Sequence, residues 1–280
     1  MMRHEIEKIP VQIFSVTAPG PAPFAADDRI FLGEGLFETV RIHNQKPHYA
    51  QLHWQRMRDS ASLLNIQFEL SYDAWHAALE KCIQDAPIIT GGVKVILSGG
   101  RAVRGLTTQG QTPCLLFSPF AYSATHEACH LVSASWLRDP NNPIYRLKSI
   151  NYLESILARK QAVAAGADDA LFFNVFNHAT ETTTANLFTI KNDHVFTPGL
   201  ASGVLAGITR SRLLSLCAMA GVPCTEQALD KEAINSADAV FVTNALQGIR
   251  LVKSLDAFSI PASHPLVIFL QDLWQQDDKG

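Results

Sequence analysis

The sequence predicts an α+β fold organised as two domains. Segments whose apolar residues alternate at every second position are interspersed with segments whose apolar residues recur every three or four positions, so strands and helices are mixed along the chain. The 280 residues, of which 47% are hydrophobic, suffice for one large domain or two modest ones. No periodicity crosses the small, polar stretch 119–128. We therefore interpret it as a linker between a small domain (1–118) and a larger domain (129–280).

The first domain is expected to contain strands and two helices. In chain order the elements are a strand at 36–43, helices at 50–64 and 72–84, and strands at 93–97 and 114–118. The first strand alternates at period two and leads into the turn-forming pair Asn44-Gln45. The Gly-, Arg- and Thr-rich stretch 98–112 is a loop. Helical spacing predicts these buried residues: Leu52, Met57, Ala61 and Leu64 in the first helix, and Tyr72, Trp75, Leu79 and Cys82 in the second.

The second domain is expected to continue with both element types. In chain order they are a strand at 130–136, a helix at 152–165, strands at 170–174, 186–191 and 195–197, a helix at 209–220, strands at 239–243 and 249–252, and a final helix beginning at Pro265. The pair Asn192-Asp193 suits a tight hairpin turn, and Gly221 is a natural helix stop. The inward residues expected in the helix at 152–165 are Leu153, Ile156, Leu157, Lys160 and Val163.

Composition favours a small molecule as the partner. The net charge of -3 and the lack of a Lys or Arg run argue against nucleic acid or an anionic membrane surface. The five cysteines are odd in number and scattered, which fits a reducing compartment better than a disulfide framework. The first seven residues lack a signal-peptide core, and no stretch reaches the roughly 18 to 20 apolar residues of a membrane-spanning helix. These features predict a cytoplasmic protein.

A literal H-E-x-x-H string occurs at His126–His130. In metalloproteases this spacing places two imidazoles on one face of a helix, where they bind zinc. Here the string runs directly into the strand-like segment Leu131–Ser135, and no obvious third ligand follows. We therefore expect no metal site, and interpret the string as part of a solvated linker.

A lysine, a glutamate and a glycine-led turn follow one another in the second half of the chain. Lys148 precedes a predicted helix, Glu181 begins the string E-T-T-T-A-N-L-F, and Gly207-Ile208-Thr209-Arg210 opens another predicted helix. A lone lysine is usually a solvated surface charge. Together, however, these residues resemble the signature of the fold-type IV (class IV) pyridoxal-phosphate enzymes in both order and spacing: a lysine, then E-x-x-x-x-N-L-F about thirty residues later, then G-I-T-R.

The resemblance implies pyridoxal 5'-phosphate as the cofactor and Lys148 as the catalytic, Schiff-base lysine. A partly neutral lysine amine can bond an aldehyde. By the same resemblance Glu181 would contact the pyridine nitrogen, because a protonated ring is the better electron sink. Gly207, Ile208 and Thr209 would bind the phosphate through N–H groups and a hydroxyl at a helix start. Taken alone, this turn would be an ordinary helix start capped by Thr209.

The resemblance covers residues 27–255 and so includes the first half. His53-Trp54-Gln55-Arg56-Met57 is similar to the family's H-x-x-R-L segment, which implies that Arg56 binds the cofactor phosphate. Tyr152 lies near the position of a tyrosine that bonds the cofactor's phenolic oxygen in branched-chain aminotransferases. Its spacing from the lysine is one residue shorter, so core packing is an equal alternative. The family places its cofactor between a small and a larger domain and commonly forms homodimers, and both are implied here.

Two segments resemble the aminodeoxychorismate lyases of the family. Phe37-Glu38-Thr39-Val40-Arg41 matches their F-E-T-x-R, where branched-chain aminotransferases show F-E-G-I-R. Thr243-Asn244-Ala245-Leu246 matches their T-N-A/S-L, where branched-chain enzymes show T-G-T-A. The resemblance therefore implies conversion of 4-amino-4-deoxychorismate to 4-aminobenzoate and pyruvate, a step towards folate.

A substrate with two carboxylates needs cationic or amide donors. Arg104 lies in a loop that resembles the family's substrate-side loop and is the candidate for a carboxylate, although exposed loop arginines are common. Asn244 is a candidate for the cofactor phosphate or the substrate, and Thr39 for the same cleft. Three other interpretations stay open: an aminotransferase for D-amino or branched-chain amino acids, a cofactor-binding regulatory protein without turnover, and a structural α+β domain without cofactor.

Overall fold

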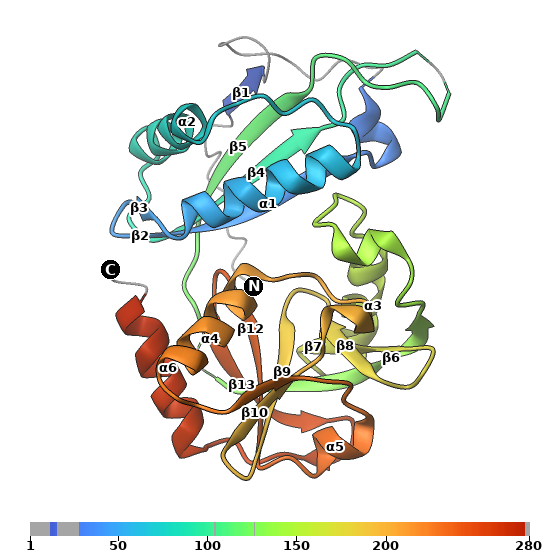
Figure 1. The fold of residues 1–280 in the computed structure, drawn as a ribbon, viewed down its shortest axis with the longest axis vertical. Coiled ribbons are helices and arrows are strands. Elements are labelled where there is room, and N and C mark those ends of the chain that lie inside the picture. Colours follow the sequence, from blue (N-terminus) through green and yellow to red (C-terminus); the bar gives the residue numbers. More distant parts are fainter. Residues whose placement is uncertain (1–11, 16–27, 104, 126, 278–280) are drawn as a thin grey trace, which may run out of the picture. The chain divides into compact units, whose positions relative to one another are not determined.

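The computed structural model describes residues 12–15, 28–103, 105–125 and 127–277 (Figure 1). The chain divides into two compact units. Unit 1 comprises the chain up to Ser123 together with the segment Lys148–Ile150, and unit 2 comprises Ala124–Leu147 and the chain from Asn151 onwards. Each unit combines helices with β-sheet, which confirms the predicted α+β class.

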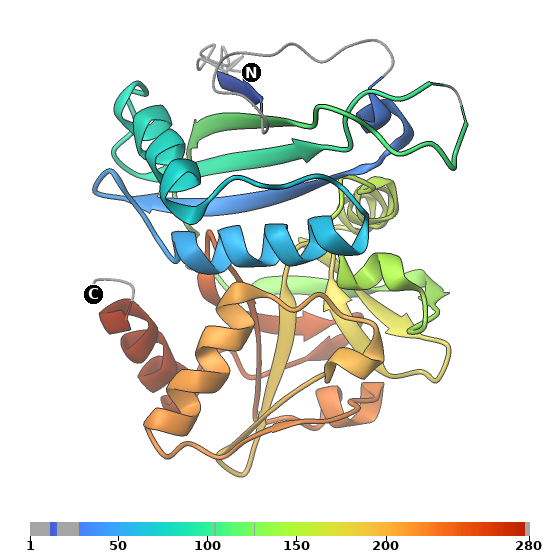
Figure 2. The same ribbon diagram turned by 45° about the horizontal axis from the view of Figure 1, so that its top comes forward.

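Unit 1 is built on an antiparallel sheet. In the described residues the strand order is β1-β5-β4-β2-β3. Figures 1 and 2 show the helices α1 and α2 on one face of this sheet. The elements are β1 (Gln12–Ser15), the 3-10 turn η1 (Arg29–Leu32), β2 (Gly35–His43), β3 (Lys46–Pro47), α1 (Ala50–Leu63), α2 (Tyr72–Gln84), β4 (Gly91–Ser98) and β5 (Cys114–Ala121).

The core of unit 1 lies between its sheet and its helices. Met57 and Ala61 of α1 are fully or almost fully buried, as predicted. Leu52 was predicted to face inward as well, but its side chain is 44% exposed. The inward stripe of α1 runs through Ala50, His53, Trp54, Met57 and Ala61 at helical spacing, and Leu52 is out of phase with it. The sequence alone favoured the leucine over the histidine because only the leucine is apolar.

Unit 2 contains a sheet that closes on itself. Its strand order is β11-β10-β9-β12-β13-β6-β7-β8, and β8 pairs back onto β9 through Glu181 and Asn186, so the strands from β9 to β8 form a closed ring. The elements are β6 (Cys129–Arg138), η2 (Pro143–Arg146), α3 (Leu153–Ala164), β7 (Asp169–Asn174), β8 (Ala179–Thr182), β9 (Asn186–Lys191), β10 (His194–Thr197), η3 (Leu200–Ser202), α4 (Ile208–Met219), β11 (Cys224–Glu226), α5 (Lys231–Asn235), β12 (Ala239–Asn244), β13 (Gly248–Leu255), β14 (Phe258–Ser259) and α6 (Pro265–Asp277).

Several local signals of unit 2 are confirmed. Asn192 and Asp193 both have positive φ, 51° and 57°, the backbone that a tight hairpin between β9 and β10 requires. Gly221 follows α4 with φ +67°, and Pro265 is the first residue of α6. The short elements β8, β11, β14 and α5 were not predicted, because their lengths of two to five residues are too short to show a period.

The buried face of α3 differs from the prediction. The helix packs on β7 through Ala158 and Ala162, which are completely buried together with Phe172. Leu153 and Val163, which were expected inward, are 67% and 61% exposed, and Ile156 and Leu157 are also exposed. Small alanines allow the helix to approach the sheet closely, so its larger apolar residues point away from the core of unit 2.

Two further features concern the chain's course. Strand β5 continues through Ala121, into the stretch where we expected a linker, and the units part between Ser123 and Ala124. Among the described residues, no helix combines the length and the apolar content needed to cross a bilayer.

Candidate active site

Lys148 lies beside strand β2 in unit 1. Its carbonyl oxygen accepts a hydrogen bond from the Phe37 N–H (2.8 Å), and the Ile150 N–H donates to the Gly35 carbonyl (3.1 Å). The segment Lys148–Ile150 therefore runs antiparallel to β2, with Ser149 opposite Leu36. This pairing fixes the backbone of a lysine that would otherwise belong to a loop.

Phe37, Thr39 and two lysines share one face of the unit 1 sheet. The ammonium groups of Lys148 and Lys94 lie 4.3 Å and 4.7 Å from the centre of the Phe37 ring, within the range of cation–π contacts. Thr39 is directly opposite Lys94 in the β2–β4 register, so their side chains point the same way. Lys94 is exposed and forms no ion pair with any described residue. It was missed at the sequence level because it lies within an otherwise apolar strand.

A buried cluster of three side chains occupies the helix-covered side of the same strand. Arg56 donates from Nε to Oε1 of Glu38 (2.7 Å) and from Nη2 to Oε2 (2.6 Å). His53 Nδ1 lies 2.7 Å from Glu38 Oε2. The Glu38 and His53 side chains are 1% and 2% exposed, and that of Arg56 is 16% exposed. Arg56, the predicted phosphate ligand, is therefore held by Glu38, for which the sequence predicted no role.

The electrostatics of this cluster favour a charged Glu38 and a neutral His53. Burial by itself would raise the pKa of Glu38, but the Arg56 charge and the His53 hydrogen bond outweigh it and lower the pKa to about 2. Burial lowers the pKa of His53, and this effect exceeds the opposing influence of the Glu38 carboxylate. A neutral His53 must carry its proton on Nδ1 in order to donate to Glu38.

Glu181 lies in unit 2, on β8. Its Oε1 accepts from Arg138 Nη1 (3.2 Å), and its Oε2 accepts from the Leu205 N–H (3.0 Å) and Asn186 Nδ2 (3.3 Å). Donors therefore meet both oxygens, which suits a carboxylate. Arg138 is itself buried: it is paired with Glu154 (2.9 Å) and stacked 3.5 Å from the centre of the Phe172 ring.

Strand register aligns Glu181 with the turn before α4. Glu181 is opposite Asn186, and Asn186 is opposite Thr243, so three strands carry these side chains in one row. The Asn186 amide also donates to the Leu205 carbonyl (3.0 Å). A Cβ on Gly207 would lie 2.0 Å from Asn186 Oδ1, so only glycine allows the turn to lie this close to the row. The structure thus brings together Glu181 and Gly207, which the sequence separates by 26 positions.

The start of α4 has the features of an anion site. Its N-cap is Gly207, which offers no side-chain cap, so the N–H groups of Ile208 and Thr209 have no acceptor within the helix. The hydroxyls of Thr209 and Thr243 are buried without a hydrogen-bond partner among the described residues. Unsatisfied buried donors at a helix start are what a phosphate group would satisfy. These residues therefore fit a phosphorylated cofactor, and Thr243 joins those that the sequence predicted.

The remaining predicted residues have different surroundings. Tyr152, in unit 2, is the N-cap residue of α3 and is half-buried. Asn244 uses its Oδ1 to accept from the N–H groups of Leu246 (3.1 Å) and Gln247 (2.9 Å), so its amide oxygen fixes the β12–β13 turn. Arg104 lies outside the described residues.

The H-E-x-x-H string is only partly described. His126 lies outside the described residues, and His130 is on strand β6, where its Nδ1 is 2.6 Å from Ser254 Oγ.

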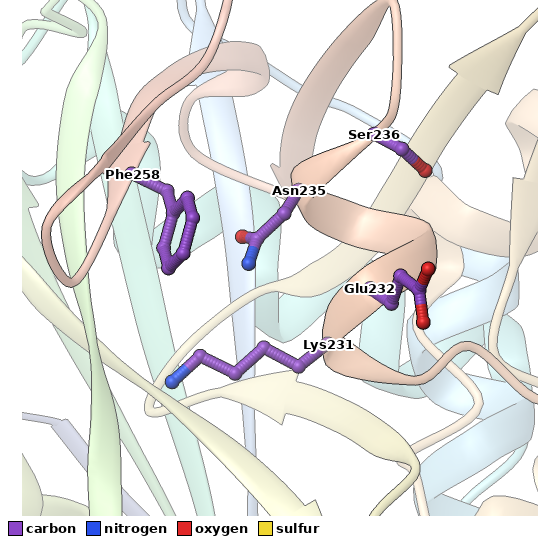
Figure 3. Close-up of a pocket in the computed structure, with 5 residues that line it drawn as sticks. All are labelled: Lys231, Glu232, Asn235, Ser236 and Phe258. Carbon is purple, nitrogen blue, oxygen red and sulfur yellow. The ribbon is translucent and has the colours of Figure 1, made fainter.

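A hollow of about 610 Å³ on unit 2 lies apart from these residues. Figure 3 shows its lining: Lys231, Glu232, Asn235, Ser236 and Phe258. The Lys231 ammonium is paired with Asp256 (2.5 Å), and the other lining groups supply no acid–base pair or nucleophile. We therefore assign the hollow no part in the chemistry.

Comparison with known proteins identifies the family. The family model described as amino-transferase class IV matches residues 35–255, which include Lys148, Glu181 and the turn at Gly207. The chain belongs to the class IV aminotransferase family. Enzymes of this family, aminotransferases and aminodeoxychorismate lyases alike, depend on pyridoxal phosphate.

Individual members of the class IV family resemble the chain over most of its length. Aminodeoxychorismate lyase of Vibrio harveyi is 29% identical over 237 residues, 82% of this chain and 86% of that protein. A branched-chain-amino-acid aminotransferase of Pseudomonas aeruginosa is 26% identical, covering 82% of this chain and 78% of its own. A crystal structure from Legionella pneumophila, provisionally assigned as 4-amino-4-deoxychorismate lyase, is 52% identical with a TM-score of 0.90, covering 91% of this chain and 96% of that one.

Proposed function

We propose that the chain is an aminodeoxychorismate lyase that uses pyridoxal 5'-phosphate to convert 4-amino-4-deoxychorismate to 4-aminobenzoate and pyruvate. The strongest support is the 52% identity to the Legionella protein, against 26% to the Pseudomonas aminotransferase. The lyase-like segments at Phe37–Arg41 and Thr243–Leu246 agree with it, because both lie among the site residues described above.

The residues of unit 1 would bind the substrate and move its protons. Lys148 removes the proton from the ring carbon that bears the amine, and later delivers a proton to the pyruvate carbon as the carbon–oxygen bond breaks. Lys94, on the same sheet face, offers an ammonium to one substrate carboxylate, and Thr39 opposite it offers a hydroxyl. Arg104 is proposed for a second carboxylate. Arg56 binds the cofactor phosphate.

The residues of unit 2 would hold the cofactor. When bound, the cofactor supplies an electron sink for the carbanion formed on proton removal. Glu181 holds a proton at the pyridine nitrogen, and the Leu205 N–H, Asn186 and Arg138 orient its carboxylate. The N–H groups of Ile208 and Thr209, with the Thr209 and Thr243 hydroxyls, bind the phosphate. We also propose that the Asn244 amide nitrogen contacts substrate or cofactor, and that Tyr152 packs beside the site.

The decisive experiment is product analysis without a keto acid. Purified protein is mixed with cofactor and aminodeoxychorismate, and both 4-aminobenzoate and pyruvate are measured by chromatography. We expect equimolar products over many turnovers, and none with the Lys148→Ala variant. A protein that forms neither product, yet transaminates an amino acid when a keto acid is added, would overturn the lyase assignment.

The alternative is an aminotransferase, which the similarity to the Pseudomonas enzyme favours. An aminotransferase keeps the amino group on the cofactor until a keto acid accepts it, so its turnover requires that second substrate. The Lys94 position also separates the two functions. For a lyase with a dicarboxylate substrate, Lys94→Met should raise KM about tenfold and Lys94→Arg should restore most of it. Branched-chain amino acids carry one carboxylate, and their KM should change less.

We further propose that the chain forms a homodimer through α3. Leu153, Ile156, Leu157 and Val163 form an exposed apolar stripe on this helix, and such patches mark interaction surfaces. Sedimentation should show a dimer for the native chain and a monomer for Leu157→Arg. The matched control is Leu63→Arg, an equally apolar exposed position on α1 that should leave the dimer intact. The scattered, free cysteines support a reducing, cytoplasmic location.

A further inference from the structure

The Glu38 cluster is arranged around a single carboxylate. His53 and Arg56 lie one turn apart on α1, and both meet Glu38 on β2. Nε and Nη2 of Arg56 donate to the two oxygens of Glu38, and His53 adds a third hydrogen bond to Oε2. Glu38 and His53 are almost fully buried.

A buried ion pair of this kind is expected to add little to the free energy of unfolding. Removing two charges from water costs several kcal/mol, and apolar residues of similar volume often stabilise a core as well or better. A bidentate pair does, however, fix the plane and direction of a guanidinium that would otherwise explore many rotamers. The carboxylate can impose this geometry only if it cannot rotate itself. The His53 hydrogen bond supplies that restraint, because it anchors the oxygen that Arg56 Nη2 shares.

We propose that His53 is a positioning residue which, by anchoring Glu38, holds the Arg56 guanidinium in the orientation that binds the cofactor phosphate. This inference rests on the proposed role of Arg56 and is independent of whether the reaction is a lyase or an aminotransferase reaction. His53 acts through Glu38 and needs no contact with cofactor or substrate. Burial keeps its imidazole neutral, so it anchors Glu38 without competing with Arg56 as a second cation.

The test measures how much the phosphate group contributes to binding. Cofactor-free protein is titrated with pyridoxal 5'-phosphate and with pyridoxal, which lacks the phosphate, and binding is followed by visible absorbance. The dissociation constant of pyridoxal divided by that of pyridoxal 5'-phosphate reports the phosphate interaction separately from the rest of the cofactor. Arg56→Gln should lower this ratio strongly. His53→Leu, which keeps the site filled but removes the hydrogen bond, should lower it about tenfold.

Matched variants separate positioning from general packing. In His53→Asn the amide nitrogen takes the place of Nδ1 and should keep a near-native ratio, whereas His53→Gln places its amide further along the side chain and should lower it. Trp54→Phe is the control, because it removes one hydrogen bond (Trp54 Nε1 to Leu70 O, 3.1 Å) from the adjacent buried position. It should leave the ratio unchanged even if the melting temperature falls. In an Arg56→Gln background, His53→Leu should have no further effect on the ratio.

The outcomes distinguish the possible failures. An unchanged ratio in His53→Leu, or an equal loss of affinity for both ligands, overturns the positioning role of His53. The phosphate-binding role proposed for Arg56 would not be affected. An unchanged ratio in Arg56→Gln overturns the phosphate role of Arg56 and the inference with it. If His53→Leu does not fold, the Asn and Gln pair decides: equal ratios in the two overturn the proposal, and a lower ratio in Gln supports it.

Discussion

One glutamate in each unit, Glu38 and Glu181, accepts hydrogen bonds from an arginine and from other donors, but the two side chains differ in solvent exposure. Glu38 has only 1% of its side chain exposed, and its donors are the side chains of His53 and Arg56. Glu181 has 15% exposed, and one of its donors is the backbone of the turn that leads to α4. A fully buried carboxylate can only orient neighbouring residues, whereas a partly exposed carboxylate can also contact a ligand.

The largest effect is expected at Lys148, the proposed Schiff-base lysine. Lys148→Ala should leave activity below detection, a fall of more than about 10³-fold, because it removes the group that moves the protons. Mass spectrometry after borohydride reduction should find cofactor attached at residue 148 in the native protein and no such adduct in the variant. Cofactor trapped on another lysine in the native chain would contradict the assignment.

The next effect distinguishes Glu181 as a group that meets the cofactor. Glu181→Gln should lower kcat by about 10²-fold or more, because a neutral amide no longer favours a proton at the pyridine nitrogen, while cofactor binding changes little. Steady-state kinetics and the cofactor dissociation constant provide the measurement. Glu154→Gln is the matched control, since Glu154 shares Arg138 with Glu181 but is assigned no contact with the cofactor. Equal losses in both variants would show that Arg138 pairing, not ring contact, explains the effect.

Glu38 should behave as the fully buried counterpart. Glu38→Gln should reduce the free energy of unfolding by about 3 kcal/mol, because Arg56 would lose its counter-charge in a buried site. Urea denaturation measures this, and Glu69→Gln, an exposed glutamate of the same unit, should cost less than about 0.5 kcal/mol. A kcat loss in Glu38→Gln without any change in stability or phosphate affinity would remove the distinction between the two glutamates.

The smallest effect is a pH dependence that follows from the Glu38 cluster. The pKa of Glu38 is about 2 in the fold, against 4.5 as the ordinary value, so its contribution is complete above pH 4.5 and is lost as the pH falls towards 2. The pKa of His53 also lies below its ordinary 6.5, so the unfolded chain takes up a proton first and stability declines as the pH falls below 6.5. Both shifts therefore predict acid destabilisation. The free energy of unfolding, measured from pH 7 to 3, should decline less for Glu38→Gln than for the native protein.

Sequence reasoning succeeded where the signal was local. The spacing of Met57 and Ala61 predicted part of the buried face of α1, and Asn192-Asp193 predicted a hairpin, because each depends on neighbours a few residues away. The order of Lys148, Glu181 and the turn at Gly207 was sufficient to indicate the family. The same reasoning failed for α3, whose apolar residues are exposed, because periodicity shows that a face is apolar but not what covers it.

The sequence by itself determined the fold class, most long elements and the family, since periodicity and residue order are properties of the chain alone. Only the tertiary structure decided which residues meet: Glu38 with His53 and Arg56, Lys94 with Phe37, and the row of Glu181, Asn186 and Thr243. These contacts depend on strand register and on the approach of a helix to a sheet. Both are set by packing across segments that the sequence keeps apart, so no local pattern encodes them.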